Sequence, residues 1–273
     1  MGTTQLKGKT ALVTGASSGL GAAFARQLAA MGADLVITAR RVENLEALAR
    51  ELEERHGIKV TVVGLDLSEP GAPAMLYAAT EGKGQRVDVL INNAGGGLHQ
   101  KFADAPWEKI ARQMQLNVLS LTELTHLFVK AMRGRGGHVL NVSSIGAYTP
   151  TPTYATYAAG KAFVRDFTEA VAYELRDTSV RVCCLCPGGT LTEFHLAAGQ
   201  TLPGAMRATF MSAERCAAIG LSALFSGRRN VISGITNSLG MFLLRFLPRR
   251  MIVWASALIM GESREAPRAL PPG

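Results

Sequence analysis

The feature that most constrains the fold of this chain is its alternation of short apolar runs with longer helical patterns. The apolar runs cover residues 9–14, 33–39, 59–65, 87–91, 138–142 and 180–186. Runs of this length are typical of strands buried on both faces, and strands that alternate with helices indicate a parallel sheet. The sequence therefore predicts an α/β fold with a doubly wound parallel sheet, covered by helices on both sides.

One domain holds most of the chain in this prediction. The 273 residues, of which 48% are hydrophobic, can build one large core, and no linker-like tract interrupts residues 1–240. We expect a substrate loop over 190–230 within this domain and an apolar, basic helical segment over 241–260. The Pro-rich stretch 261–273 is expected to be disordered.

The composition limits the partners. A formal net charge of +8 suits an anionic cofactor, an acidic lipid surface or nucleic acid, but the chain has no nucleic-acid motif and only 6% aromatic residues. We therefore expect no nucleic-acid partner. Four cysteines and no apolar leader segment predict reduced thiols and a cytoplasmic location. Cys183 and Cys186 lie three apart on a predicted strand, on opposite faces, so we expect no metal site.

A glycine-rich turn joins the first predicted strand to a helix over 22–31. Its spacing is G-x-x-x-G-x-G over residues 15–21. Glycines let a ligand approach the backbone closely, and the N-terminus of the following helix presents free N–H groups to a diphosphate. A tight turn without a ligand is the alternative interpretation. The candidate cofactor contacts here are Gly15, Ser17, Ser18, Gly19, Leu20 and Gly21.

Two arginines, Arg40 and Arg41, directly follow the second predicted strand. In a doubly wound sheet an acid near this point binds the ribose 2′-hydroxyl, whereas arginine accommodates a 2′-phosphate. The pair therefore favours NADP(H), with NAD(H) as the alternative, although residues 16–18 add no basic side chain. The other interpretation is that both arginines only begin the next helix, over 42–56.

Polar residues also follow the third and fourth predicted strands. Asp66 and Leu67 end the third strand, where the carboxylate can accept from an adenine amine or cap the next helix. After the fourth strand, Asn93, Ala94 and Gly95 allow side-chain to backbone bonding and a close cofactor approach.

Tyr157 and Lys161 lie four apart on a predicted helix over 154–174 and therefore share one face. An ammonium group beside a phenol favours the phenolate, so we expect Lys161 to lower the pKa of Tyr157. The phenol could then act as a general acid or base. An ordinary helical pair is the alternative, and Tyr154 has no lysine at the same offset.

Several motifs, taken in order, resemble the short-chain dehydrogenase/reductase family. They are TGASSGLG at 14–21, NNAG at 92–95, NVSS at 141–144, YAAGK at 157–161 and PGGTLT at 187–192. The resemblance covers residues 6–192 and implies a single doubly wound parallel-sheet (Rossmann) domain, with a C-terminal substrate-loop and helical extension. It also implies an NAD(P)-dependent oxidoreductase that acts on CH–OH and C=O groups.

The resemblance implies a catalytic role for Asn117, Ser144, Tyr157 and Lys161. Tyr157 would pass a proton to or from the substrate oxygen, Ser144 would bind that oxygen, and Lys161 would bind the nicotinamide ribose. Asn117, in the middle of a predicted helix over 106–133, would hold a water linked to Lys161. The segment with Pro187, Gly188, Thr190 and Thr192 would bracket the nicotinamide, and Tyr157 and Lys161 would also contact the cofactor.

The substrate-side sequence is apolar, with Phe194, Leu196, Leu202, Met206, Phe210 and Met211 as its large residues. This favours a hydrophobic carbonyl or alcohol. Segment 241–260 is interrupted by Arg245, Pro248, Arg249 and Arg250, which disfavours a transmembrane helix. It suits a peripheral contact with anionic lipid, a lid over the pocket or a dimer interface.

Two further expectations remain at the level of the whole protein. The family resemblance implies a homodimer or homotetramer. The alternative to an enzyme is a non-catalytic cofactor-binding redox sensor or scaffold at a membrane surface, which would have no need of the tyrosine and the lysine.

Overall fold

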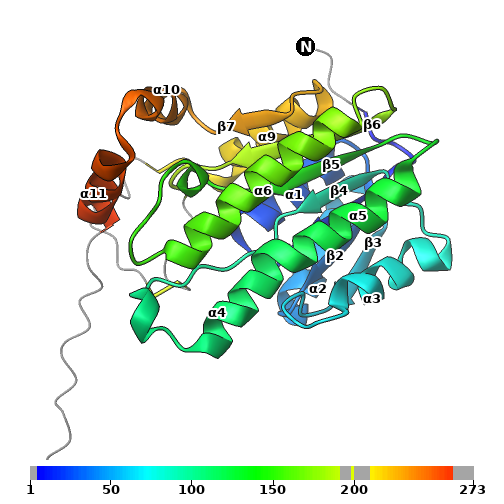
Figure 1. Ribbon diagram of the computed structural model, residues 1–273. Coiled ribbons are helices and arrows are strands. Elements are labelled where there is room, and N and C mark those ends of the chain that lie inside the picture. Colours follow the sequence, from blue (N-terminus) through cyan, green and yellow to red (C-terminus); the bar gives the residue numbers. More distant parts are fainter. Residues whose placement is uncertain (1–4, 191–197, 200–209, 261–273) are drawn as a thin grey trace, which may run out of the picture.

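The computed structural model describes residues 5–190, 198–199 and 210–260. In these residues one parallel sheet carries seven strands in the order β3-β2-β1-β4-β5-β6-β7 (Figure 1). The strands are β1 (Thr10–Thr14), β2 (Asp34–Ala39), β3 (Val60–Gly64), β4 (Val89–Asn92), β5 (Gly137–Val142), β6 (Val180–Cys186) and β7 (Asn230–Ile232). The predicted doubly wound α/β fold is confirmed.

Helices cover both faces of the sheet (Figure 1). One face carries α1 (Gly19–Ala30), α2 (Val42–His56) and α9 (Ala213–Phe225), and the other carries α3 (Ala72–Ala79), α5 (Leu121–Met132) and α6 (Ala155–Glu174). The described helices also include α4 (Trp107–Met114), α10 (Ile235–Leu243) and α11 (Arg249–Met260). Figure 1 shows α10 and α11 at one edge of the molecule, beyond β7.

The strand order reverses at β1, which pairs with β2 on one side and β4 on the other. Ala11 lies opposite Leu35 and Val89, while the next residue, Leu12, lies opposite Val36 and Leu90. At such a reversal the loops after the two strands diverge, which opens a crevice at the carboxyl ends of the strands. This crevice is where a doubly wound fold binds its ligand.

The core consists of two apolar layers, one on each face of the sheet. Successive residues of β1 enter different layers, since Val13 packs with Phe24 of α1, whereas Leu12 packs with Phe128 of α5. This follows from the two-residue period of a strand. Each fully buried side chain of this size contributes about 1.5–3 kcal/mol, so both helix layers are needed to hold the sheet.

Two sequence predictions need correction. The substrate loop predicted over 190–230 extends too far, because residues 213–225 form α9, which packs on the sheet beside α1, and residues 230–232 form β7. The continuous helix predicted over 106–133 is α4 and α5 joined by a π-helical segment, η3 (Gln115–Ser120). The helical segment predicted over 241–260 is the end of α10, a short helix over 244–246 and α11, while the other predicted strands and helices are present with ends that differ by up to three residues. The stretch 261–273, predicted to be disordered, lies outside the described residues.

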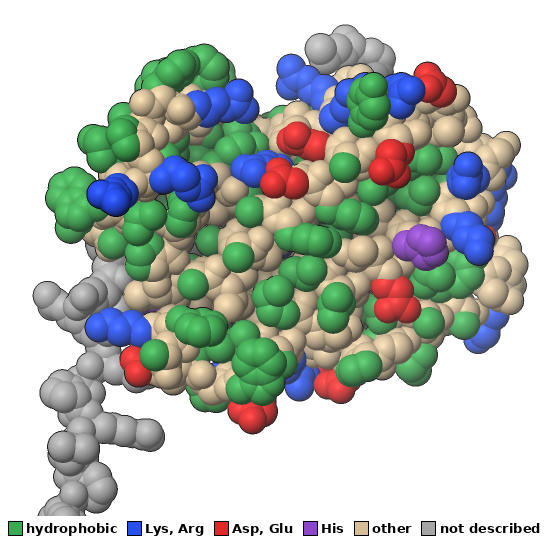
Figure 2. Space-filling model, in the orientation of Figure 1, with side chains coloured by type: hydrophobic (Ala, Val, Ile, Leu, Met, Phe, Trp, Pro, Cys, Tyr) green, Lys and Arg blue, Asp and Glu red, His purple; other side chains and the backbone are tan. Residues whose placement is uncertain are grey.

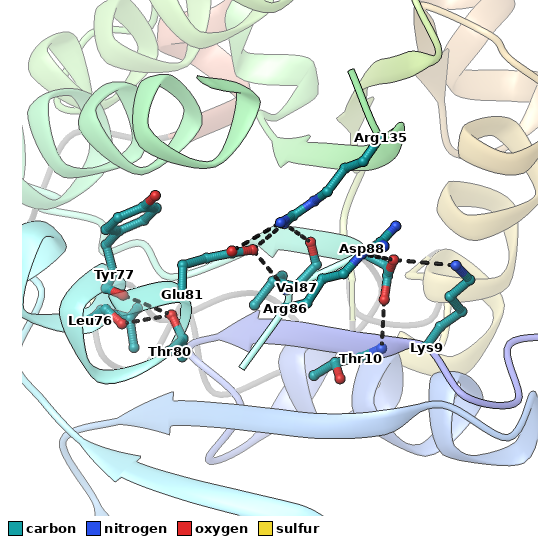
Figure 3. A network of polar contacts seen from close by, with 10 residues as sticks. All are labelled: Lys9, Thr10, Leu76, Tyr77, Thr80, Glu81, Arg86, Val87, Asp88 and Arg135. Atoms are coloured by element: carbon teal, nitrogen blue, oxygen red, sulfur yellow. Dashed lines mark hydrogen bonds and ion pairs between the residues drawn. The ribbon is translucent and has the colours of Figure 1, made fainter. Parts of the chain in front are cut away.

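Charged side chains link the strands at their amino ends, opposite the crevice (Figure 3). The nearly buried Asp88 accepts from the backbone N–H of Thr10 at 3.1 Å and pairs with Lys9 at 3.4 Å and Arg86 at 3.0 Å. The carboxylate thus ties the start of β1 to the segment before β4. Beside it, the Glu81 carboxylate pairs with Arg135, which precedes β5.

Candidate active site

The glycine turn after β1 is tightly packed against the end of β4. Gly15 has a φ of +67°, and a Cβ there would lie 2.9 Å from the Cα of Ala94. A Cβ at Gly21 would overlap the carbonyl oxygen of Gly15. The Asn93 amide donates to the carbonyl oxygens of Thr14 at 2.9 Å and Gly15 at 3.2 Å. Only glycine therefore fits at positions 15 and 21, and the turn is preorganised before any ligand binds.

Thr14 is a site residue that the sequence reasoning missed. Its buried hydroxyl accepts from the backbone N–H groups of Asn93 at 3.0 Å and Ala94 at 2.9 Å, and it donates to the carbonyl of Ile91 at 3.3 Å. One side chain on β1 thereby fixes the loop after β4. The signal in the sequence was a polar residue at the end of an otherwise apolar run, directly before the first glycine.

The two arginines after β2 occupy different environments. The Arg41 guanidinium donates to the hydroxyls of Ser18 at 2.6 Å and Ser17 at 3.3 Å, in the glycine turn. The Arg40 side chain is 70% exposed, and its Nη1 lies 4.0 Å from a carboxylate oxygen of Asp66. Arg41 precedes α2, but its side chain makes no capping hydrogen bond to that helix. The arginines therefore do more than begin a helix, and they bring positive charge beside the turn.

Asp66 follows β3 on the same side of the crevice. Its carboxylate accepts from the backbone N–H of Ser68 at 2.9 Å and the Ser68 hydroxyl at 2.6 Å, and it pairs with Arg112. Burial pushes the pKa of Asp66 upward, but the Ser68 hydrogen bonds and the charges of Arg112 and Arg40 outweigh it and hold the pKa below its ordinary value. The carboxylate is therefore ionised, and it does not cap α3, whose N-cap is Gly71.

Leu67, the residue next to Asp66, is buried, and its carbonyl accepts from the Ser120 hydroxyl at 2.6 Å. This bond links the loop after β3 to the π-helical segment.

Asn117 lies in the π-helical segment and is almost fully buried. Its amide oxygen accepts from the backbone N–H of Gly96 at 2.9 Å, and its amide nitrogen donates to the carbonyl of Gly96 at 2.8 Å. The extra backbone residue of a π-turn re-aims side chains, and such turns are frequent at functional sites. Asn117 thus fixes the glycine stretch after β4, and a Cβ at Gly95 would lie 3.2 Å from its amide oxygen.

Tyr157 and Lys161 lie on the first turns of α6, with the Lys161 Nζ 5.8 Å from the centre of the Tyr157 ring. The buried ammonium donates to the carbonyl of Val142 at 2.8 Å. The Ser143 hydroxyl donates to the carbonyl of Lys161 at 2.6 Å, which ties this turn of α6 to the end of β5. Ser144, the next residue, is hydrogen-bonded to Tyr157. The predicted tyrosine, serine and lysine therefore lie together at the carboxyl end of the sheet.

Burial governs the protonation of this cluster. It raises the pKa of Tyr157 to about 12, with the Ser144 hydrogen bond acting in the opposite direction. It lowers the pKa of Lys161 to about 8. The net pKa of Tyr157 is thus raised and not lowered, because removal of the phenolate from water has the largest effect. The phenol is consequently protonated at neutral pH.

The segment after β6 closes the crevice on the side of β7. The Pro187 carbonyl accepts from the Ile145 N–H at 2.9 Å, and the Gly188 N–H donates to the Ser233 hydroxyl at 3.1 Å. The Thr190 hydroxyl donates to the Gly188 carbonyl at 3.0 Å. Of the predicted cofactor and substrate residues, Thr192, Phe194, Leu196, Leu202 and Met206 lie outside the described residues.

His99 is a second residue that the sequence reasoning missed. Its ring lies 4.9 Å from that of Tyr154, which in turn lies 5.7 Å from that of Tyr157. Burial lowers the pKa of His99 below its ordinary value, and among the described residues its buried Nε2 has no hydrogen-bond partner. The signal in the sequence was the position of this histidine, two residues after the NNAGGG stretch at 92–97. The imidazole adds a neutral polar group near the tyrosine cluster.

Comparison with known proteins gives the family. Residues 9–202 match the short chain dehydrogenase family. The chain belongs to it. A 7beta-hydroxysteroid dehydrogenase from Collinsella aerofaciens is 38% identical over 200 residues, which are 72% of this chain and 73% of that protein. A sulfoacetaldehyde reductase from Chromohalobacter salexigens is 37% identical over 190 residues, 67% of this chain and 73% of that protein.

Solved structures of this family have the same fold. One, from a study of 7beta-hydroxysteroid dehydrogenase stereoselectivity, superposes with a TM-score of 0.86 at 31% identity and covers 94% of this chain and 100% of its own. A short-chain dehydrogenase from Sphingobium yanoikuyae in complex with NADPH superposes with a TM-score of 0.79 at 29% identity, covering 96% and 98%.

Membership of the family makes this chain an oxidoreductase that acts on hydroxyl or carbonyl groups and takes a nicotinamide dinucleotide. The residues present fit such a cofactor. The loops after β1 and β4 are so close together that they leave no room for a Cβ at Gly15 or Gly21. A Cβ at Gly95 would lie 3.4 Å from the Lys161 Nζ. Within the described ranges, none of the helices has the length and hydrophobicity that a membrane crossing needs.

Proposed function

We propose that this protein is an NADP(H)-dependent reductase of a hydrophobic carbonyl compound, with Tyr157 as the proton donor. The observation that carries the proposal is the position of the buried Lys161 ammonium 5.8 Å from the centre of the Tyr157 ring, with Ser144 hydrogen-bonded to Tyr157. A group that is protonated at neutral pH suits proton donation, which is what the reduction of a carbonyl requires.

The chain's own groups divide the work of this reaction. The cofactor, when bound, supplies the hydride. The Tyr157 hydroxyl gives its proton to the substrate oxygen, while the Ser144 hydroxyl binds that oxygen and orients the carbonyl. The Lys161 ammonium stabilises the phenolate that proton donation leaves. Asn117 holds the loop after β4 in place through its two hydrogen bonds to the backbone of Gly96.

The preference for NADP(H) rests on Arg40 and Arg41. A 2′-phosphate adds an anionic group with several acceptor oxygens, and guanidinium groups bind such a group through paired hydrogen bonds. The Arg41 guanidinium donates hydrogen bonds to the serine hydroxyls of the glycine turn, and its neighbour in the chain, Arg40, has an exposed side chain. Solved structures of similar proteins include complexes with NADPH and with NAD, so the preference rests on the two arginines.

The hydrophobic substrate is inferred from the surroundings of the catalytic groups. Phe210 and Met211 lie against Gly189, and the Tyr154 ring packs beside Tyr157. Relatives point the same way, since one is named a hydroxysteroid dehydrogenase and another structure is that of a bulky-bulky ketone specific alcohol dehydrogenase.

The test is turnover of a panel of aliphatic, aromatic and steroid ketones with NADPH, and with sulfoacetaldehyde as the small charged comparison. Tyr157→Phe is expected to lower kcat for the accepted ketone by about 10²–10⁴-fold, because general acid catalysis contributes this much. Tyr154→Phe, the matched control one turn earlier, should retain most activity. Unchanged turnover in Tyr157→Phe would contradict the mechanism, and a preference for sulfoacetaldehyde would contradict the substrate class.

A further inference from the structure

The helices α10 and α11, with the short helix η5 (Leu244–Phe246) between them, form the C-terminal helix pair, residues 235–260. Eleven of the seventeen exposed large hydrophobic side chains in the described residues belong to it. They are Ile235, Leu239, Phe242, Leu243, Phe246, Leu247, Met251, Val253, Trp254, Leu258 and Ile259. Exposed apolar surface concentrated in this way marks an interaction site.

Contact with the other described residues buries little of this helix pair. In α11 the buried residues are Ile252 and Ser256, and the Ser256 hydroxyl donates to the carbonyl of Pro150 at 2.7 Å. In α10 no residue is fully buried. A lid over the pocket would use only the buried side of these helices, and the eleven large hydrophobic side chains on their outer face are exposed.

The charge on this surface selects the kind of partner. Residues 235–260 contain Arg245, Arg249 and Arg250, all exposed, and no Asp or Glu. Figure 2 shows blue side chains among the hydrophobic ones at this edge, while the acidic side chains on the visible face lie over the body of the molecule. A symmetric contact between two copies of this surface would bring six arginines together with no carboxylate from either segment.

We propose that the outer face of the C-terminal helix pair docks on the surface of an anionic lipid bilayer. Exposed Leu, Phe and Trp side chains beside cationic residues match the composition of helices that lie in the plane of the interface. Trp254, 67% exposed, and Phe246, 73% exposed, enter the boundary between headgroups and acyl chains, while the arginines remain at the lipid phosphates. This contact is a surface contact without a spanning segment.

The direct test is sedimentation of the full chain with vesicles of phosphatidylcholine alone and of phosphatidylcholine with phosphatidylglycerol, at low and high salt. We expect binding to the anionic vesicles that weakens with salt. Arg245→Gln/Arg249→Gln/Arg250→Gln should weaken the partition coefficient by roughly 100-fold, from about fivefold for each basic residue at a charged surface. The control Arg50→Gln/Arg55→Gln/Lys59→Gln makes the same change of net charge elsewhere and should bind as the parent does.

A second readout follows the apolar side of the contact. The sequence has two tryptophans, so Trp107→Phe leaves Trp254 as the sole indole. Its emission should shift to shorter wavelength on anionic vesicles and be quenched by brominated lipid. Three results would overturn the proposal: no vesicle binding, equal binding of the triple variant, or a dimer in solution that Phe246→Ser dissociates and that buries Trp254. The last would identify a second copy as the occupant. Equal melting temperatures and NADPH binding show that the variants are folded.

Discussion

At the scale of single residues, adjacent side chains of one type have different tasks. Arg41 contacts the serines of the glycine turn, whereas Arg40 is exposed beside Asp66. We expect Arg41→Gln to raise the Kd for NADPH by about 10- to 100-fold, since a hydrogen bond to a charged group is worth roughly 1.5–3 kcal/mol, and to leave the Kd for NADH nearly unchanged. Calorimetric titration with both cofactors measures this, with Arg50→Gln as the control. An equal loss for NADH would show that Arg41 only supports the turn.

Burial of the charged Lys161 side chain lowers the stability of the folded protein. Its pKa is lowered to about 8 in the folded protein, below the roughly 10.4 of an unfolded lysine. The unfolded chain binds this proton more tightly, so the contribution of Lys161 to the free energy of unfolding rises with pH between these two values. Lys161→Met also loses the hydrogen bond to the Val142 carbonyl, but the free-energy cost of that loss does not change with pH.

We therefore expect the stability of Lys161→Met, relative to the parent, to be greatest below pH 8 and to decline steadily towards pH 10.5. Urea unfolding at a series of pH values measures the difference, and Lys59→Met, at an exposed lysine, should show no such trend. A difference that stays constant with pH would mean that Lys161 is charged in both states. Activity is expected to be lost in Lys161→Met.

At this scale much of the site follows from residue type and order. The tyrosine, serine and lysine lie together as predicted, and the serines of the glycine turn contact Arg41. The role of Thr14 could not be predicted, because a threonine at a strand end has several possible partners and only the position of β4 beside β1 selects them. The pKa of Tyr157 also depends on burial, which the sequence does not supply.

At the scale of secondary structure, α9 is held close to the sheet by a glycine. A Cβ at Gly220 would lie 2.9 Å from a methyl of Leu185 and 3.4 Å from Phe24 and Leu140. Gly220→Val should therefore cost about 1–3 kcal/mol of stability through overpacking. Gly240→Val is the matched control, because a Cβ at Gly240 in α10 meets nothing within 4 Å. Denaturant unfolding of both variants checks this, and equal stabilities would mean that α9 can shift outward at no cost.

Boundaries and irregularities were the weak point of prediction at this scale. The buried stripe of α9, Ala213, Cys216, Ala217, Gly220, Leu221 and Leu224, has helical spacing, so this helix was predictable from the residues. The π-helical turn at Asn117 was not, because it has the same residue types as an ordinary helix. It forms here together with the paired hydrogen bonds between Asn117 and Gly96.

At the scale of the whole molecule, the two ends of the sheet have separate tasks. The charged network of Asp88, Arg86 and Lys9 ties the strands at their amino ends, while the glycine turn, Tyr157 and Lys161 occupy the carboxyl ends. The parallel sheet with helices on both faces followed from the alternation of strands and helices. The position of residues 235–260 did not, because few of their side chains are buried, Ile252 and Ser256 in α11 among them, and most of their large hydrophobic side chains are exposed.

The hydrogen bond from Ser256 to Pro150 connects that outer helix to the loop that leads into α6. A partner that shifts α11 would therefore have to move this loop with it or break the bond. Binding free energies are reciprocal, so a substrate that holds the loop in one arrangement would change the affinity of α11 for such a partner by the same factor as the partner changes the affinity for the substrate.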